Sequence, residues 1–310
     1  MNVNHPTTRP LGRRCVLGML GAVAAAGLMP ARRAQAKGAA TSALDFDGEA
    51  LVVVGTRVQR FDPSGDATRL PAPRTPIRAL ACHPDRPGQL FAALDGGGLD
   101  RSEDGGRTWS AASGGLPQAQ ITALAIAAGA PDSVYAAIAG DGLWRSEDAG
   151  TRWSFVMDRP WIAEAEREIL TLASVNLASG MGGIWIYAGT DQGVTRVPDC
   201  FCRWQDVVAG DAMDALVAGT SPAPEAPLPE GEPVKSLVSA NSAPERLYAA
   251  LPSGLWASTD GGVAWENRSS LHAQALAVDP ADPDHIAATS ATKLKHSRDG
   301  GATWATLAAL

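Results

Sequence analysis

One eight-residue motif recurs in this 310-residue chain and limits what it can fold into. The motif reads Ser-x-Asp-x-Gly-x-x-Trp, and its copies are SEDGGRTW (102–109), SEDAGTRW (146–153), STDGGVAW (258–265) and SRDGGATW (297–304). The sequence upstream of the motif repeats as well, as in VYAAIAGDGLWRSED and LYAALPSGLWASTD. A unit of about forty residues therefore recurs, and a period of that size is typical of solenoids and propellers.

The repeated unit has the pattern of short β-strands. Its apolar or alternating runs are bounded by Gly, Pro, Asp and Ser, and none has the period of an amphipathic helix. In one unit we expect strands at ITALAI (121–126), SVYAAIA (133–139), LWRSED (143–148) and RWSFV (152–156). Four short antiparallel strands per unit predict the blade of a β-propeller.

The blades can be counted along the chain. The strand pattern predicts an all-β propeller domain at 43–310 with six four-stranded blades, at about 43–70, 77–112, 121–157, 169–207, 233–268 and 272–310. The first unit has strands but lacks the motif Ser and Trp, and the fourth carries a degenerate copy, VPDCFCRW (197–204). Seven blades are the alternative, because DVVAGDAMDALVAG (206–219) is a candidate strand pair.

Within each motif, the Ser and Asp oxygens can accept turn N–H groups, the Gly permits an unusual backbone angle, and the Trp folds back over the hairpin. On these repeats the chain resembles the Asp-box (BNR) β-propeller family, including exported BNR-repeat and photosystem-assembly-factor-like proteins. The resemblance places the motif hairpins on the rim of the disc. The residues with this structural role are Ser102, Asp104, Gly106, Trp109, Ser146, Asp148, Gly150, Trp153, Asp199, Trp204, Ser258, Asp260, Gly262, Trp265, Ser297, Asp299, Gly301 and Trp304.

Residues 1–36 have the layout of a bacterial export signal. Arg13 and Arg14 precede an apolar run (15–30) and the small-residue stretch ARRAQA, which a signal peptidase would cut after Ala36. Paired arginines before a mildly apolar segment predict the twin-arginine route, with general secretion as the alternative. We therefore expect a periplasmic or secreted protein with a short linker at 37–42.

The charge balance limits the partners. The chain has 26 basic and 33 acidic residues, and residues 1–36 hold five arginines and no acid, which leaves 21 basic against 33 acidic residues, or −12. A strongly negative surface repels phosphates and anionic membranes, so we expect no nucleic-acid partner. No later apolar stretch is long enough to span a bilayer, so we do not expect an integral membrane protein.

No catalytic residue, metal site or cofactor is predicted. Tyr135, Tyr187 and Tyr248 share one repeat position with Phe91, so they should pack rather than act as the nucleophile of a sialidase. The histidines lack the spacing of metal ligands. Phosphate-binding loops and dinucleotide fingerprints are also absent from the sequence.

The family includes sialidases, xyloglucanases, receptors and assembly factors, so the resemblance alone does not determine the function. The main prediction is a non-catalytic exported scaffold that binds another exported or membrane-attached protein. A secreted glycan hydrolase or lectin is the alternative, because Asp95, Asp141 and Asp191 lie in equivalent turns on one face. The sequence leaves the oligomeric state open.

Two insertions, at 157–168 and 206–233, are not explained by the repeat. Both join an outer strand to the next inner strand, so both should emerge on the face opposite the motif turns. The first is compatible with a helix and carries Trp161, the only tryptophan outside the blades. Trp161, Arg159 and Glu164 are therefore candidate binding residues, with packing of the loop onto its blade as the alternative role of Trp161.

The degenerate motif contains Cys200 and Cys202. Three interpretations remain open: a disulfide that replaces the lost motif contacts, a pair of free thiols, or a redox or metal-binding pair. Cys82 aligns with Val278 on an inner strand, so we expect it to be buried and inert.

Overall fold

The computed structural model describes residues 43–55, 57–74, 76–127, 129–130, 132–162, 164–179, 183–208 and 226–310. The predicted export signal and linker at 1–42 lie outside these residues, as does most of the candidate strand pair at 206–219. Residues Lys37–Leu310 group into one compact unit.

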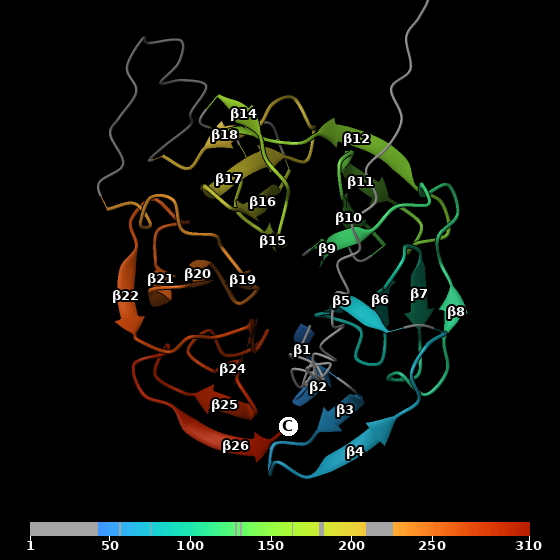
Figure 1. Ribbon diagram of the computed structural model, residues 1–310, viewed down its shortest axis with the longest axis vertical. Coiled ribbons are helices and arrows are strands. Elements are labelled where there is room, and N and C mark those ends of the chain that lie inside the picture. Colours follow the sequence, from blue (N-terminus) through green and yellow to red (C-terminus); the bar gives the residue numbers. More distant parts are fainter. Residues whose placement is uncertain are drawn as a thin grey trace, which may run out of the picture. The chain divides into compact units, whose positions relative to one another are not determined.

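Within the described residues the regular structure is β and forms six four-stranded antiparallel sheets around a common centre (Figure 1). Blades one to three contain β1 (Ala43–Asp47), β2 (Ala50–Val54), β3 (Val58–Phe61), β4 (Ala67–Leu70), β5 (Ile77–Cys82), β6 (Leu90–Leu94), β7 (Leu99–Ser102), β8 (Ser110–Ala111), β9 (Ile121–Ile126), β10 (Val134–Ile138), β11 (Gly142–Ser146) and β12 (Ser154–Asp158). Blades four to six contain β15 (Thr171–Val175), β16 (Trp185–Thr190), β17 (Gly193–Pro198), β18 (Gln205–Asp206), β19 (Ser236–Ala240), β20 (Ala243–Leu251), β21 (Gly254–Ser258), β22 (Glu266–Ser269), β23 (Ala275–Val278), β24 (Ile286–Ser290), β25 (Lys293–Ser297) and β26 (Ala305–Ala309).

Each blade follows the chain order from an inner strand at the centre to an outer strand on the rim (Figure 1). The prediction of six blades is confirmed, and the alternative of seven is wrong. Inner strand β15 of the fourth blade contacts β19 of the fifth, so no further blade separates them. The ring closes where Leu44 and Phe46 of the first blade pack with Ala277 of the sixth.

The hydrophobic core is divided among the spaces between neighbouring blades. Phe91 of the second blade, for example, packs with Ile126 and Trp153 of the third. The second strand of a blade has a strand on each side and a blade on each face, so β6 is buried at all its positions. This burial explains why LFAAL is a continuous apolar run rather than an alternating one.

The tyrosines that share a repeat position with Phe91 link neighbouring blades. The Tyr187 hydroxyl donates to the carbonyl of Gly261 (2.7 Å), and the Tyr248 hydroxyl donates to that of Pro283 (2.8 Å). Both rings are fully buried. These side chains therefore hold the ring together and are not presented to a substrate.

Candidate functional site

The four regular motifs form one kind of turn. In the copy at 146–153, Ser146 Oγ accepts the N–H of Gly150 (2.8 Å) and donates to Asp148 Oδ1 (2.9 Å), which accepts the N–H of Arg152 (2.8 Å). Gly150 has a φ of +86°, and a Cβ there would lie 3.1 Å from the Phe91 ring, so the turn requires glycine. The same hydroxyl and carboxylate contacts occur in the copies that begin at Ser102, Ser258 and Ser297.

The turns use the charge of their carboxylates. Hydrogen bonds from the Thr108 and Thr303 hydroxyls lower the pKa of Asp104 and of Asp299 to about 2. The backbone N–H of Arg152 lowers the pKa of Asp148. Each motif carboxylate thus accepts hydrogen bonds within the turn of its own blade.

Most motif tryptophans bind the preceding blade. Trp153 Nε1 donates to the Ala112 carbonyl (2.8 Å), and Trp204 Nε1 donates to the Asp158 carbonyl (2.7 Å). Trp109 and Trp304 make the same kind of bond, to Pro71 O and Ser269 Oγ, whereas Trp265 Nε1 donates within its own turn, to Gly262 O. The tryptophans therefore have a structural use at the rim.

The insertion at 157–168 is compatible with a helix in its sequence, but its described residues form strands instead. Asp158 ends β12, and the segment forms a two-stranded hairpin of β13 (Trp161–Ile162) and β14 (Ala165–Glu166). Glu164 lies in the turn with a φ of +59°. So short a helix is marginal on its own, and here ion pairs fix an extended conformation instead.

Arg159 lies inside this hairpin rather than facing outward. Its guanidinium bonds the carboxylates of Glu166 and Glu168. Glu168 also accepts the N–H of Gly140, in the β10–β11 turn, and Arg167 pairs with Asp191, in the β16–β17 turn (3.5 Å). The hairpin is thus attached to both neighbouring blades, on the side of the ring where second and third strands are joined; we call this side the hairpin face.

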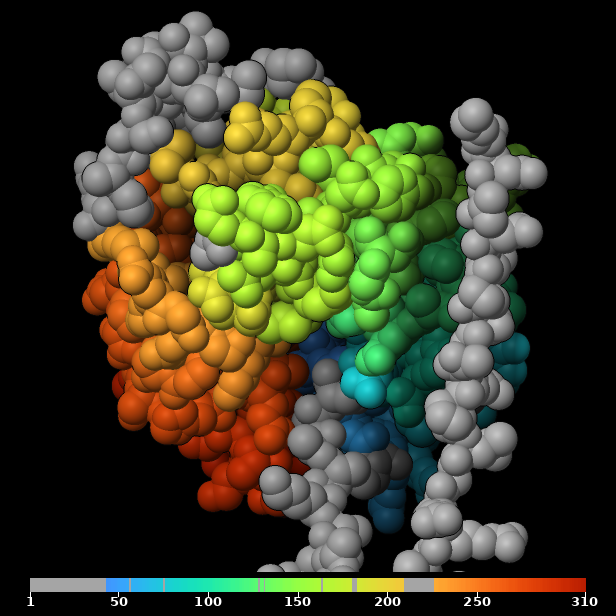
Figure 2. All heavy atoms as spheres, turned by 45° about the horizontal axis from the view of Figure 1, so that its top comes forward, coloured from blue at the N-terminus to red at the C-terminus, as the bar shows by residue number. Residues whose placement is uncertain are grey.

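Trp161 is the largest exposed apolar residue on the described surface, with 63% of its surface accessible. Leu170, 37% exposed, follows the hairpin, and Glu164 is also exposed. Figure 2 shows the yellow-green segment that contains the hairpin as a projecting lobe beside the central hollow. Of the three residues predicted to bind a partner, the structure exposes Trp161 and Glu164 and uses Arg159 as an internal support.

The described end of the second insertion, residues 226–233, begins at the rim. The backbone N–H of Trp265 donates to the Ala226 carbonyl (2.8 Å) beside the motif turn of the fifth blade. The Glu232 carboxylate then accepts the N–H of Ser253 (2.8 Å), in the β20–β21 turn. This insertion therefore also reaches the hairpin face.

The aspartates of the alternative hydrolase prediction lie on this face, but in separate blades. Asp95 pairs with Arg78 (2.9 Å), and Asp141 accepts from Trp144 Nε1 (2.6 Å). Asp191 pairs with Arg167 of the hairpin. Each carboxylate thus supports a local contact, and no two of them share a turn.

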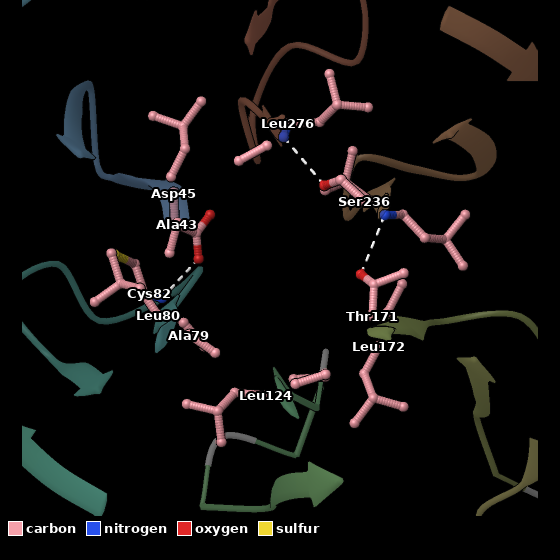
Figure 3. Close-up of a pocket in the computed structure, with 18 of the residues that line it drawn as sticks. Ala43, Asp45, Ala79, Leu80, Cys82, Leu124, Thr171, Leu172, Ser236 and Leu276 are labelled. Carbon is pink, nitrogen blue, oxygen red and sulfur yellow. Dashed lines mark hydrogen bonds between the residues drawn. The ribbon is translucent and has the colours of Figure 1, made fainter. Parts of the chain in front are cut away.

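The inner strands of all six blades line a central channel with a volume of about 210 Å³. Small and aliphatic side chains dominate its wall (Figure 3). Hydroxyl groups connect neighbouring inner strands, since Thr171 Oγ1 accepts the N–H of Leu237 (3.2 Å) and Ser236 Oγ accepts that of Leu276 (3.0 Å) (Figure 3).

Asp45 interrupts this apolar ring. Its Oδ2 accepts the N–H of Cys82 on the neighbouring inner strand (2.7 Å, Figure 3), and its Oδ1 accepts the N–H of Phe46 (2.9 Å). Burial raises the pKa of Asp45 to about 7. The equivalent positions of the other inner strands hold Ala81, Ala125, Ala173, Val238 and Ala277.

Sequence reasoning did not identify Asp45, although it is a charged residue at a repeat position that the other blades fill with alanine or valine. Among the described residues that line the channel, Asp45 is also the only acid. A single carboxyl group lacks the partner that glycoside hydrolysis uses. Cys82 is buried, and burial raises the pKa of its thiol well above the usual value, which disfavours the reactive thiolate.

In the part of the chain that the structure describes, no group of three or more His, Cys, Asp or Glu side chains is placed to hold a metal ion. The same residues contain no helix long and apolar enough to cross a membrane.

No protein-family model and no curated protein matches the sequence. Solved structures do match the fold. The GH74 xyloglucanase of Xanthomonas campestris gives a TM-score of 0.53 at 17% identity, over 86% of this chain and 47% of that enzyme. A chain of the COPII outer coat vertex on membranes gives 0.58 at 9% identity, over 88% of this chain and 71% of that one.

A structure of YCF48 bound to a D1 peptide gives a TM-score of 0.43 at 16% identity, over 84% of this chain and 75% of that one. The chain spans less than half the length of the GH74 enzymes it matches, at 47%, 46% and 36%. At these identities the matches with TM-scores above 0.5 establish the propeller fold, which is shared by enzymes and coat proteins and so leaves the activity undetermined.

Proposed function

We propose that the chain is an exported, non-catalytic Asp-box propeller that binds another protein through its hairpin face. The observation that carries this proposal is the 63% exposure of Trp161 on a hairpin that ion pairs attach to two blades. A tryptophan is among the residues that contribute most to binding when a partner buries them.

The fixed hairpin supports this role energetically. Arg159, bonded to Glu166 and Glu168, restrains the segment before a partner arrives. An anchor that is already ordered loses less conformational freedom on binding. Exposed acidic residues such as Glu164 and Glu166 favour a partner with a basic patch around the pocket that receives the indole.

A glycan-active enzyme is the competing proposal, and the positions of the carboxylates favour it less. Hydrolysis of a glycosidic bond ordinarily needs two carboxyl groups within about 5–10 Å on either side of the bond. Asp95, Asp141 and Asp191 lie in different blades and hold Arg78, Trp144 and Arg167. An exposed indole can also stack on a sugar, so glycans belong in the test.

The proposed export rests on residues 1–36 and has its own test. Expression in a bacterium with a twin-arginine pathway, followed by fractionation and N-terminal sequencing of the mature chain, should give a periplasmic or secreted product that begins at Lys37. An uncleaved product retained in the cytoplasm would contradict the export proposal.

The binding proposal is tested with a photo-crosslinking residue at position 164, and with the same residue at position 155 as a control. Phe155 is 45% exposed but lies on outer strand β12 and not in the hairpin. In extracts of exported and membrane proteins, the 164 probe should give discrete crosslinked species that the 155 probe does not.

Trp161→Ala should remove those species, whereas the matched variant Phe155→Ala should keep them, with both variants folded by circular dichroism. Crosslinks that persist in Trp161→Ala would contradict the hairpin as the contact surface. Turnover of a glycoside by the wild type, lost in Asp141→Asn or Asp191→Asn, would overturn the non-catalytic assignment in favour of the competing one.

A further inference from the structure

The turn at 197–204 differs from the regular motif turns in how it is held. Val197 replaces the motif serine, so the hydroxyl that elsewhere accepts the glycine N–H is absent. Phe201 replaces the glycine and has a φ of +53°. Its N–H donates to the Pro198 carbonyl (2.8 Å). Among the hydrogen bonds of the described residues, none joins the Asp199 carboxylate to an N–H of this turn.

A covalent bond takes the place of these contacts. Cys200 and Cys202 form a disulfide with their Cα atoms 5.5 Å apart, and both residues are exposed. The bridge spans a single residue, so it restricts the unfolded chain little and adds little to global stability. Its effect is therefore local, on the shape of this turn.

The residue inside the bridge contacts the preceding blade. The Phe201 ring lies 6.1 Å from the ring of Tyr135, and the Arg145 guanidinium lies over it at 5.4 Å. Trp204, at the end of the same turn, donates to the Asp158 carbonyl of the third blade (2.7 Å). The disulfide thus controls a turn that joins the third blade to the fourth.

We propose that the Cys200–Cys202 disulfide is a redox-active site that exchanges with low-molecular-weight thiols such as glutathione. Exposed disulfides are the ones that thiols reach and reduce most readily. Because a single residue separates the two cysteines, the free thiolate of a mixed disulfide can close the bridge again by attacking the other cysteine's sulfur and expelling the small molecule as its thiolate.

The exchange takes two steps. A thiolate attacks one sulfur of the bridge, the S–S bond breaks, and its electron pair leaves on the other cysteine as a thiolate, which gives a mixed disulfide. A second thiolate attacks the small-molecule sulfur of that mixed disulfide, so the attached cysteine leaves as a thiolate. The small molecule departs as its own disulfide, and protons from water complete the two protein thiols. Two thiols are thus oxidised as one protein disulfide is reduced, and oxidised glutathione drives the reverse reaction.

The dithiol form lacks the bond that replaced the motif contacts. We expect the turn to open and Phe201 to lose its fixed place between Tyr135 and Arg145. The regular turn at 146–153 keeps its Ser146 and Asp148 hydrogen bonds in either redox state, so it serves as an internal reference.

The experiment equilibrates the full chain with glutathione buffers of graded ratio, alkylates it, and maps the cysteines by peptide mass spectrometry. Cys200 and Cys202 should convert together from bridged to doubly alkylated under native conditions, while buried Cys82 stays unlabelled. Hydrogen exchange of amides 199–204 should rise at least tenfold on reduction, and that of amides 146–153 should stay constant.

Two kinds of variant sharpen the result. Cys202→Ser and Cys200→Ser should each trap a mixed disulfide with oxidised glutathione. Val197→Ser combined with Cys200→Gly, Phe201→Gly and Cys202→Ala rebuilds a regular motif, and this chain should fold and show no redox response.

A bridge that millimolar reduced glutathione opens only after denaturant is added would overturn the proposal. Cysteines that stay as thiols in excess oxidised glutathione would overturn it as well. Reduction that leaves the exchange of amides 199–204 unchanged would overturn the claim that the bond holds the turn.

Discussion

The motif turns at the rim and the β13–β14 hairpin with its flanking residues both depend on charged side chains, but in different ways. Asp148 accepts hydrogen bonds within its own turn, as the equivalent aspartates do in theirs. Arg167 and Glu168 instead reach from the hairpin to the turns of two different blades. A polar group that recurs at the same place in each blade serves the fold, whereas one that occurs once marks a place where the molecule departs from its repeat.

Two tryptophans of neighbouring segments, one buried in a motif turn and one exposed on the hairpin, give the largest expected difference in stability. Trp153→Ala should lower the free energy of unfolding by about 3–5 kcal/mol, because Trp153 is buried between two blades and bonded to Ala112. Trp161→Ala should change it by less than about 0.5 kcal/mol, because Trp161 faces solvent. Urea unfolding of both variants checks the contrast. Equal losses of unfolding free energy in the two variants would contradict the assignment of Trp153 to the core and of Trp161 to a free surface.

Asp45 and the motif aspartates should change the free energy of unfolding in opposite directions as pH rises. The folded chain keeps the Asp45 proton up to about pH 7, whereas the unfolded carboxyl loses it near the ordinary 3.8. Between those values the unfolded chain binds fewer protons, so Asp45 lowers the free energy of unfolding as pH rises, by on the order of 4 kcal/mol. Asp104 and Asp299, with lowered pKa, act oppositely: their stabilisation is complete above about pH 4 and is lost as pH falls toward 2.

Asp45→Asn keeps an oxygen for the Cys82 N–H and removes the titration. Its stability relative to the wild type should therefore rise between pH 4 and pH 7 and stay level above that range. Thermal unfolding across pH measures this difference, with Asp104→Asn as the control of opposite sign. A difference that is constant over the range would show that Asp45 is already ionised in the folded chain.

A smaller difference in stability is expected between the regular turn at 146–153 and the disulfide turn at 197–204. Ser146→Ala should cost about 1–2 kcal/mol, because the buried N–H of Gly150 loses its acceptor. Asp199→Ala should cost less than about 0.5 kcal/mol, because no turn N–H bonds its carboxylate in the described structure. Denaturant titration of the two variants, in oxidising buffer, tests the comparison. A loss at Asp199 equal to that at Ser146 would mean that the degenerate turn still relies on its carboxylate.

The fold was predictable because most blades carry the same sequence pattern of strands and turn. Strand runs such as ITALAI and the turn that ends in Trp153 recur in register, so errors in one unit are corrected by the others. The hairpin at 161–166 was not predicted, and its segment was read only as compatible with a helix, because it has no counterpart in the repeat. Its shape depends on Arg159 meeting two glutamates and on Arg167 meeting Asp191, and these are contacts between segments that no local pattern reveals.

The candidate site was only partly predictable. Trp161 stood out in the sequence as a tryptophan outside the blades, and its exposure agrees with a surface role. The internal position of Arg159 was not foreseen, because its neighbours in the sequence are as compatible with an exposed arginine as with one that pairs with Glu166 and Glu168. Asp45 was missed because reasoning from clustered carboxylates passes over a single acid, although the other blades hold alanine or valine at its repeat position.

A small expected change in stability tests whether the hairpin must be fixed in place to bind a partner. Arg159→Met keeps the aliphatic stem and removes the bonds to Glu166 and Glu168, which should cost less than about 1 kcal/mol because the pairs are partly exposed. Arg152→Met, at an 89% exposed side chain, is the matched control. Hydrogen exchange at 161–167 should rise in the first variant alone, and crosslinking from position 164 should weaken several-fold, because the partner must then order the hairpin itself. If exchange rises and crosslinking does not weaken, Trp161 contributes contact area without preorganisation, and the difference between rim and hairpin lies in exposure alone.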